Sequence, residues 1–477
     1  MLFRSIMNEE NRAFYEDSSG MESYSRFQNS LEAGRLEYFD VADFEDIIEQ
    51  LIDEGDYETA EIAILQAINI HPNAIPVRIR HAQSLIFNNQ PATALRELDL
   101  LIALEGHNAD VYLLKGNACL QLEQFSKAEE CFSKAIQLAG PENDEILHMI
   151  GSAYADHDDA ETAVVYFEKA WKANPNHEMA LFDLAFYHDM LGNPERSIEY
   201  YNHYLDLDPY NLSAWFNLGI AYNRTLQFEK AIEAYDFAIA VYPTAYHAIF
   251  NKANSLANIM RYKEAIAAYR EYLRYDSSND DAMTYIAECY LNMGRKKMAR
   301  RFYQKAIDLN PANDSAWFSS GLSYWLDREY EQSISRIREA LSLDKDNPDY
   351  WFTLGKILSE TNQEDETRNA LKKATALDPS NTEAWIFFAE YLHSQKKFDD
   401  AIKVLKKGIR HNNESASIKY YLAAYLLEKN DEHEAVGQLE TALRLDFQQH
   451  TNLFEAFPKA AQNDSVKRLI KTYRPLK

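Results

Sequence analysis

Two stretches of the sequence decide how the chain is built: Ser213-Ala-Trp-Phe-Asn-Leu-Gly-Ile-Ala-Tyr222 and Ser315-Ala-Trp-Phe-Ser-Ser-Gly-Leu-Ser-Tyr324. They share Trp, Phe, Gly and Tyr at equal spacing and lie 102 residues apart, which is three times 34. A second pair, Asp349–Gly355 and Glu383–Ala389, is separated by a single step of 34 residues. The chain therefore consists largely of an internal repeat, and such a chain can grow without one central core.

Small residues mark the middle of each repeat. They recur every 34 residues, with one interval of 35, at Ala82, Gly116, Gly151, Ala185, Gly219, Ala253, Ala287, Gly321, Gly355, Ala389 and Ala423. A second, mostly small column follows twelve residues after each of these, and Ala60 adds a twelfth repeat, whose first column holds Ile48. Apolar residues recur three and four apart around both columns. This pattern predicts two amphipathic helices per repeat that cross where the side chains are small.

Polar and rigid residues mark where these helices begin and end. Asparagine, a preferred N-cap, stands just before successive first helices at Asn108, Asn143, Asn211, Asn279, Asn313, Asn347 and Asn381. Proline falls where the preceding second helix must stop, at Pro72, Pro175, Pro209, Pro243, Pro311 and Pro379. Pro348 follows Asn347 and suits the first turn of a helix.

The repeat resembles the tetratricopeptide repeat family, whose period is about 34 residues. One repeat fills all eight of the family's characteristic places, with Trp215, Leu218, Gly219, Tyr222, Ala231, Tyr235, Ala238 and Pro243. The resemblance implies an all-α fold. It predicts a right-handed α-solenoid, or superhelix, of about twelve stacked helical hairpins over residues 41–449, closed by terminal capping helices.

The segments outside the repeats differ from each other. Residues 1–40 are predicted to form an acidic, partly disordered arm, because residues 1–60 hold 16 Asp or Glu against 4 Arg and the first twenty lack an apolar period. Residues 22–33 could form a helix that covers the first repeat. In residues 450–477, Val466, Leu469 and Ile470 share one helical face, which predicts a C-terminal capping helix.

Charge and composition exclude several classes of protein. The chain has 75 acidic and 49 basic residues, so its net charge of −26 disfavours binding to nucleic acid or to anionic membranes. No apolar run approaches the length of a membrane span, and no secretory signal is recognisable. With only three cysteines, we predict a cytoplasmic protein without a disulfide framework.

The sequence contains no recognisable catalytic, cofactor or metal motif. It has no glycine-rich phosphate loop, no His-Glu-x-x-His pair, no nucleophile elbow and no Cys-x-x-Cys. We therefore predict no catalytic residues, no metal, no cofactor and no enzymatic activity. Cys119 and Cys131 could form a redox-sensitive pair or serve as small apolar core residues. A basic cluster, Arg295–Arg301, could dock an acidic partner or simply balance local charge.

The resemblance also implies a binding groove, because first helices line the inner face of such superhelices and commonly hold an extended peptide or a helix. A phenylalanine column, with two aromatic extensions, predicts apolar anchors at Phe182, Phe216, Phe250, Phe318, Phe352, Phe186 and Trp325. Polar residues near it predict backbone contacts at Asn217, Asn223, Arg224, Asn251, Asn254 and Asn258. Alternatively, the phenylalanines pack between neighbouring first helices.

These expectations lead to a non-enzymatic scaffold that binds a peptide or helix of other proteins in its groove. The alternative is a regulatory or targeting subunit of an enzyme complex whose active site lies on other chains. The sequence leaves the partner and the oligomeric state open.

Overall fold

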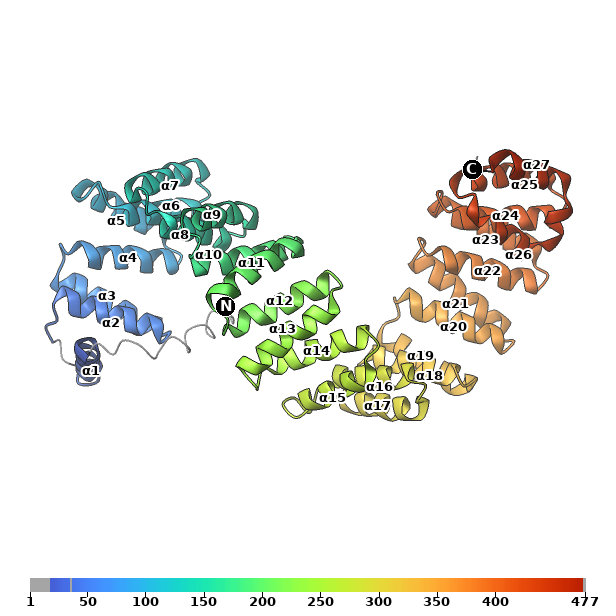
Figure 1. Ribbon diagram of the computed structural model, residues 1–477, viewed down its shortest axis with the longest axis horizontal. Coiled ribbons are helices and arrows are strands. Elements are labelled where there is room, and N and C mark those ends of the chain that lie inside the picture. The colour runs from blue at the N-terminus through green and yellow to red at the C-terminus, as the bar shows by residue number, and fades with distance from the viewer. Residues whose placement is uncertain (1–17, 35–36, 475–477) are drawn as a thin grey trace. The chain divides into compact units, whose positions relative to one another are not determined.

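The computed structural model describes residues 18–34 and 37–474, and this part of the chain is helical throughout, without strands (Figure 1). The predicted disorder of the first twenty residues falls largely on residues 1–17, which lie outside the described ranges. The chain divides into two compact units, Met1–Pro243 and Thr244–Lys477. Each is described here by itself.

The first unit contains thirteen described helices. They are α1 (Ser18–Glu32), α2 (Val41–Asp53), α3 (Tyr57–Ile70), α4 (Ile75–Phe87), α5 (Pro91–Leu104), α6 (Ala109–Gln121), α7 (Phe125–Ala139), α8 (Asp144–Asp156), α9 (Ala160–Ala173), α10 (Glu178–Met190), α11 (Pro194–Leu207), α12 (Leu212–Arg224) and α13 (Phe228–Val241).

The second unit continues the alternation up to its last helices. Its hairpins use α14 (Tyr246–Asn258), α15 (Tyr262–Tyr272), α16 (Asp280–Asn292), α17 (Lys296–Leu309), α18 (Asp314–Trp325), α19 (Tyr330–Leu343), α20 (Pro348–Glu360), α21 (Glu364–Leu377), α22 (Thr382–Ser394), α23 (Phe398–His411), α24 (Ala416–Glu428) and α25 (Glu432–Leu445). They are followed by η1 (Gln448–His450), α26 (Thr451–Ala456), η2 (Pro458–Gln462) and α27 (Asp464–Tyr473).

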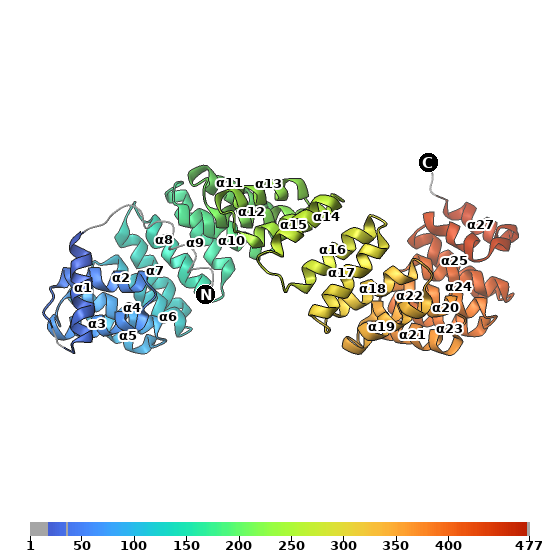
Figure 2. The same ribbon diagram turned by 90° about the horizontal axis from the view of Figure 1, so that it is seen from below.

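Consecutive helices pack as hairpins, from α2 with α3 to α24 with α25, as Figure 1 shows. The prediction of an all-α fold built from stacked helical pairs is thus confirmed. Beyond the hairpins, α1 lies against α2 (Figure 2), and α27 lies against α25. The rings of Phe27, Phe39 and Phe44 meet edge to face beneath α1 and are almost fully buried.

The helix crossings depend on the small residues of the first column. A Cβ atom built on Gly151 would lie 2.6 Å from the ring of Phe167, and one on Gly355 would lie 2.7 Å from Leu371. The same added atom on Gly219 would overlap the ring of Tyr235. In the hairpins marked by glycine, a large side chain of the second helix therefore rests directly on the backbone of the first.

Most of the predicted caps are present. The side chains of six asparagines accept a hydrogen bond from a backbone N–H of the first turn: Asn108, Asn211, Asn279, Asn313, Asn347 and Asn381. Asn143 occupies the same place without such a bond, because its backbone (φ −108°, ψ 11°) is not in the extended conformation of a capping residue. Pro348 is the first residue of α20, as predicted.

A repeated tryptophan ties each of several first helices to the turn before it. The indole Nε1–H of Trp215 donates to the carbonyl of Pro209 at 2.9 Å, and that of Trp385 donates to Pro379 at 3.0 Å. Equivalent bonds join Trp317 to Pro311 and Trp351 to Lys345. Each bond satisfies a loop carbonyl and fixes the angle at which one hairpin follows the next.

The crossing geometry generates a stability prediction. Gly219→Ala should melt at a lower temperature than Gly437→Ala, because the added methyl group forces Tyr235 to move, at a cost of roughly 1 to 3 kcal/mol that opposes the gain from helix propensity. Gly437→Ala in α25 is the matched control, because a Cβ there meets nothing within 4 Å. It should raise stability by about 1 kcal/mol through helix propensity alone. Thermal unfolding followed by circular dichroism measures both; equal shifts in the two variants would contradict the packing described.

Candidate functional site

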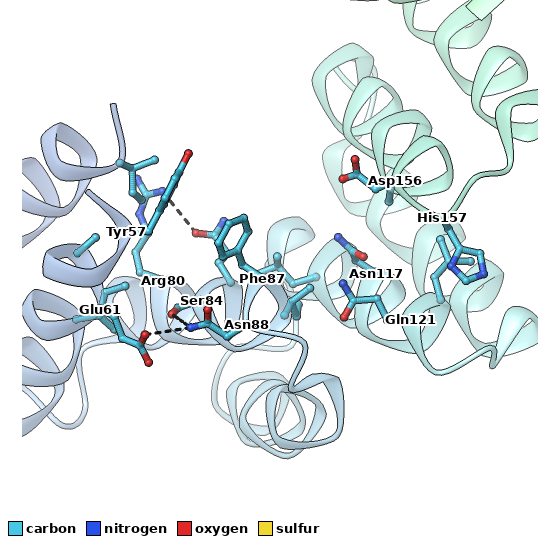
Figure 3. Close-up of a pocket in the computed structure, with 18 residues that line it drawn as sticks. Tyr57, Glu61, Arg80, Ser84, Phe87, Asn88, Asn117, Gln121, Asp156 and His157 are labelled. Atoms are coloured by element: carbon cyan, nitrogen blue, oxygen red, sulfur yellow. Dashed lines mark hydrogen bonds between the residues drawn. The ribbon is translucent and has the colours of Figure 1, made fainter. Parts of the chain in front are cut away.

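The first unit contains a cleft of about 420 Å³, formed by several first helices and by the second helix α3 (Figure 3). Its apolar floor and polar rim come from α2, α3, α4, α6 and α8. The lining residues are Ile52, Tyr57, Ala60, Glu61, Ile64, Arg80, Gln83, Ser84, Ile86, Phe87, Asn88, Leu114, Asn117, Leu120, Gln121, Ala153, Asp156 and His157.

Three places in the repeat supply much of this lining. They lie two residues before, one after and five after the small residue that marks each first helix, and we call them the groove positions. In α4 and α6 they hold Arg80, Gln83, Phe87, Leu114, Asn117 and Gln121, all of which line the cleft. Because the repeat is regular, the groove positions of other first helices identify the corresponding face there.

Two exposed rings stand at one side of the cleft. Tyr57 is 51% exposed and Phe87 is 66% exposed, and their ring centroids lie 5.2 Å apart. Figure 3 shows them opposite Asn117, Gln121, Asp156 and His157. Leaving two neighbouring aromatic rings exposed to water forgoes the free energy gained by burying them, which is typical of surfaces that another molecule covers.

Some polar side chains at the rim of the cleft already make hydrogen bonds within the protein, and others do not. Asn88 donates to Glu61 at 3.1 Å, and the Arg80 guanidinium lies 3.5 Å from the amide oxygen of Gln83. The side-chain amides of Asn117 and Gln121 make no hydrogen bond to another described residue. An amide offers both a donor and an acceptor, the combination that a peptide backbone requires.

The predicted phenylalanine column lies one residue before the first groove position. Phe182 packs edge to face on Tyr201, Phe216 lies 6.0 Å from Tyr235, and Phe250 lies 5.8 Å from Tyr269. Phe318 stacks on Tyr350 of the next hairpin at 4.4 Å, and Phe352 is only 7% exposed. Most of the column's contacts are therefore internal, while Phe186, at a groove position, is 40% exposed.

Several of the predicted polar residues serve buried tyrosines. The Asn223 amide donates to the hydroxyl of Tyr235 at 3.0 Å, and Asn254 accepts from the hydroxyl of Tyr269 at 2.5 Å. Asn217 lies beside the hydroxyl of Tyr201 without completing a hydrogen bond to it. The amides of Asn223 and Asn254 thus bind the protein's own core groups.

The remaining predicted residues have the following surroundings. Arg224 pairs with Asp189 and donates to its carbonyl at 2.8 Å, while Trp325 donates to Glu360 at 3.1 Å. Asn258 donates to the carbonyl of Asn254 at 3.1 Å and is otherwise exposed, and Asn251 is half-buried.

Two features of the structure were not predicted from the sequence. One is a column of fully buried tyrosines in consecutive second helices, at Tyr201, Tyr235, Tyr269 and Tyr303. Their 34-residue spacing was visible, but the sequence did not show that their hydroxyl groups reach the first helices. The other is the cleft at α2–α8, which lies outside the repeats where the predicted groove residues were placed. The sequence signal for this cleft was a pair of amide side chains, Gln83 and Asn117, at equivalent places 34 residues apart.

The basic cluster and the cysteines make local contacts. Lys296 pairs with Asp327 at 2.6 Å, and Arg300 pairs with Asp327 and Glu329 at 2.7 and 2.8 Å, which supports local charge balance. Cys119 and Cys131 are neighbours, free and buried, and burial raises the pKa of the Cys131 thiol to about 11. Since the thiolate is the reactive form, this environment favours a packing role.

The described residues contain neither a group of side chains suited to a metal ion nor a helix suited to crossing a membrane. Within residues 18–34 and 37–474, His, Cys, Asp and Glu side chains form no group of three or more that could hold a metal ion. Over the same part of the chain, every helix is too short or too polar to cross a bilayer.

Comparisons with known families agree with the repeat geometry. Two tetratricopeptide repeat models match residues 109–140 and 148–212. A model described as the C-terminal domain of cilia and flagella-associated protein 70, itself a tetratricopeptide repeat model, matches residues 246–457. The chain is a tetratricopeptide repeat protein. No curated protein sequence matches it.

Solved tetratricopeptide repeat structures align with about a third of the chain. A crystal structure of MamA is 24% identical, covering 34% of this chain and 95% of that one, with a TM-score of 0.33. MamA from Desulfovibrio magneticus RS-1 is 16% identical over 35% and 95%, with a TM-score of 0.34. YrrB, described as having an unusual peptide-binding site, is 26% identical over 39% and 96%, with a TM-score of 0.30.

A buried histidine in the first unit generates a pH prediction. His188 stacks on Tyr200 at 5.4 Å, and neither of its ring nitrogens has a hydrogen-bond partner among the described residues. Burial, and secondarily the nearby Arg196, lower its pKa from the ordinary 6.5. Above that value both folded and unfolded chains hold a neutral ring; below it the unfolded chain binds the proton more readily, so stability falls as pH falls.

The expected loss from this one residue is at most about 1.4 kcal/mol per pH unit. His188→Phe, which keeps a ring against Tyr200, should reduce the drop in melting temperature between about pH 7.5 and about pH 5.5. The exposed His107→Gln should retain the drop of the parent. Identical pH profiles for the parent and His188→Phe would show that this histidine does not contribute.

Proposed function

We propose that this tetratricopeptide repeat protein is a non-enzymatic cytoplasmic scaffold, whose first helices hold a peptide or a helix of partner proteins. The cleft at α2–α8 carries the proposal, because it unites an apolar floor, an exposed ring pair and amides with unused hydrogen-bonding capacity. Three free, buried cysteines are compatible with a reducing compartment. The net charge of −26 argues against nucleic acid as the partner.

The chemistry of the cleft suits a peptide better than a small polar metabolite. Asn117 and Gln121 lie one helical turn apart on α6, so their amides can meet successive peptide groups of an extended chain. Tyr57 and Phe87 give an apolar partner side chain two faces to pack on. Aromatic side chains of this kind commonly supply a large share of binding energy at protein interfaces.

We further propose that exposed groove positions outside the cleft, within each unit, also contact partners. Among the residues predicted from the sequence, Phe186, Arg224 and Asn258 are exposed. The half-buried phenylalanines and the tyrosine-bound asparagines would support these contacts from behind more than touch a partner.

Capture of partners from the native lysate tests the proposal. Phe87→Glu should lose the proteins that the parent retains, because it places a charge on the exposed ring pair without disturbing a buried residue. Leu104→Glu is the matched control, since Leu104 is also 66% exposed but lies at the end of α5, outside the cleft. Mass spectrometry identifies what each variant recovers.

Loss confined to Phe87→Glu, with helical content unchanged, supports the cleft as the binding surface. Equal recovery by all three proteins would contradict it. If the lost partners include an enzyme whose activity changes on adding the parent protein but not the variant, the chain acts as a regulatory or targeting subunit.

A further inference from the structure

One carboxylate on the first-helix face of the second unit stands apart from its neighbours. Glu288 occupies the middle groove position of α16 and is half-buried. Within the described residues, no hydrogen bond or ion pair satisfies its carboxylate, and burial raises its pKa. Taking a carboxylate out of water without a partner is unfavourable. The unpaired carboxylate of Glu288 therefore destabilises the folded chain, and packing within the fold does not explain why a glutamate stands here.

The tyrosines Tyr269 and Tyr285 lie within electrostatic range of this carboxylate. Tyr285 precedes it by one helical turn, and the rings of Phe250, Tyr269 and Tyr285 lie 5.8 to 6.0 Å from one another. Tyrosine and phenylalanine rings attract cations through their negatively polarised faces. A carboxylate flanked by such rings is suited to an ammonium or guanidinium group.

A second unsatisfied group lies close by. The hydroxyl of Tyr303 is fully buried and has no hydrogen-bond partner among the described residues. Ser319 lies beside it without completing a bond. In the preceding repeat the equivalent residues do bond, since the hydroxyl of Tyr269 donates to Asn254. Replacing Asn by Glu at this step of the repeat thus leaves both the carboxylate and the tyrosine hydroxyl without a partner.

Charge along the same face has one predominant sign. The groove positions of the second unit hold four glutamates and one lysine: Glu288, Glu360, Glu390, Glu428 and Lys356. Glu360 accepts from Tyr330 and Glu428 pairs with His393, while the hydroxyl of Tyr421 lies beside Glu390 without completing a hydrogen bond. Lys356 pairs with Glu383. Glu288 remains as the available charge.

We propose that Glu288 receives a lysine or arginine side chain of the bound partner, so that the second unit selects a basic peptide segment. The inference rests on the proposed function, since it assigns a partner chemistry to the groove positions of the second unit. The cation would donate to the carboxylate and lie against the neighbouring rings. The net charge of −26 adds a long-range attraction for a basic segment.

Binding of a labelled, amidated peptide that repeats Lys-Ala-Leu-Ala tests the proposal on the full chain by fluorescence anisotropy. Glu288→Gln keeps the shape of the side chain and should weaken binding by about tenfold or more, the range expected for loss of one charge-assisted contact. A peptide in which Gln replaces every Lys should bind the parent weakly and should not respond to Glu288→Gln.

Glu339→Gln is the matched control, because it removes the same charge from an exposed place on α19, a second helix. It should bind as the parent does. Equal weakening by both variants would overturn the proposal, since it would reveal attraction to the overall charge alone. Absence of binding by the parent would overturn it as well.

The melting temperature supplies an independent readout. Without peptide, Glu288→Gln should melt at the same temperature as the parent or higher, since a buried, unpaired carboxylate is removed. A lower melting temperature with unchanged peptide affinity would assign Glu288 an internal role and overturn the proposal. Partner capture that still depends on Phe87 would show that the cleft functions even if this inference fails.

Discussion

The rest of the structure depends on one close approach, that of a large second-helix side chain to the backbone of the first helix. Phe167 rests on Gly151, and Tyr235 rests on Gly219, where not even a methyl group fits between them. This contact recurs in the hairpins marked by glycine, and there it sets the angle between the two helices. It also directs a fixed set of first-helix positions away from the crossing, and these become the groove positions.

The tyrosines at the crossing link the core to the surface. A phenylalanine at this place ends in an apolar atom, whereas Tyr235 and Tyr269 end in hydroxyl groups that require partners. Asn223 and Asn254 on the first helices provide them. Part of the amide chemistry near the surface is therefore used inside the fold, and a residue such as Glu288, which departs from the pattern, leaves unsatisfied groups where a partner could reach them.

The helical repeat could be predicted from the sequence, whereas the site could be predicted only in part. Small residues, asparagine caps and prolines act through local geometry, so their spacing identified the helices. The prominent phenylalanines, in contrast, proved to be mostly packed, as Phe352 shows. Large apolar residues form the same sequence pattern whether they face a core or a partner. Only the exposed fraction of each side chain in the folded structure distinguishes the two cases. The cleft beside Phe87 was missed for that reason.

The sequence by itself determined the period, the all-α class and the membership in the tetratricopeptide repeat family, because each follows from residues that interact within one hairpin or between consecutive hairpins. The tertiary structure decided which side chains remain available. That choice depends on contacts between helices, such as the bond from Tyr269 to Asn254 and the absence of one between Tyr303 and Glu288. Such contacts vary with the side-chain conformation of each repeat, which a common period does not specify.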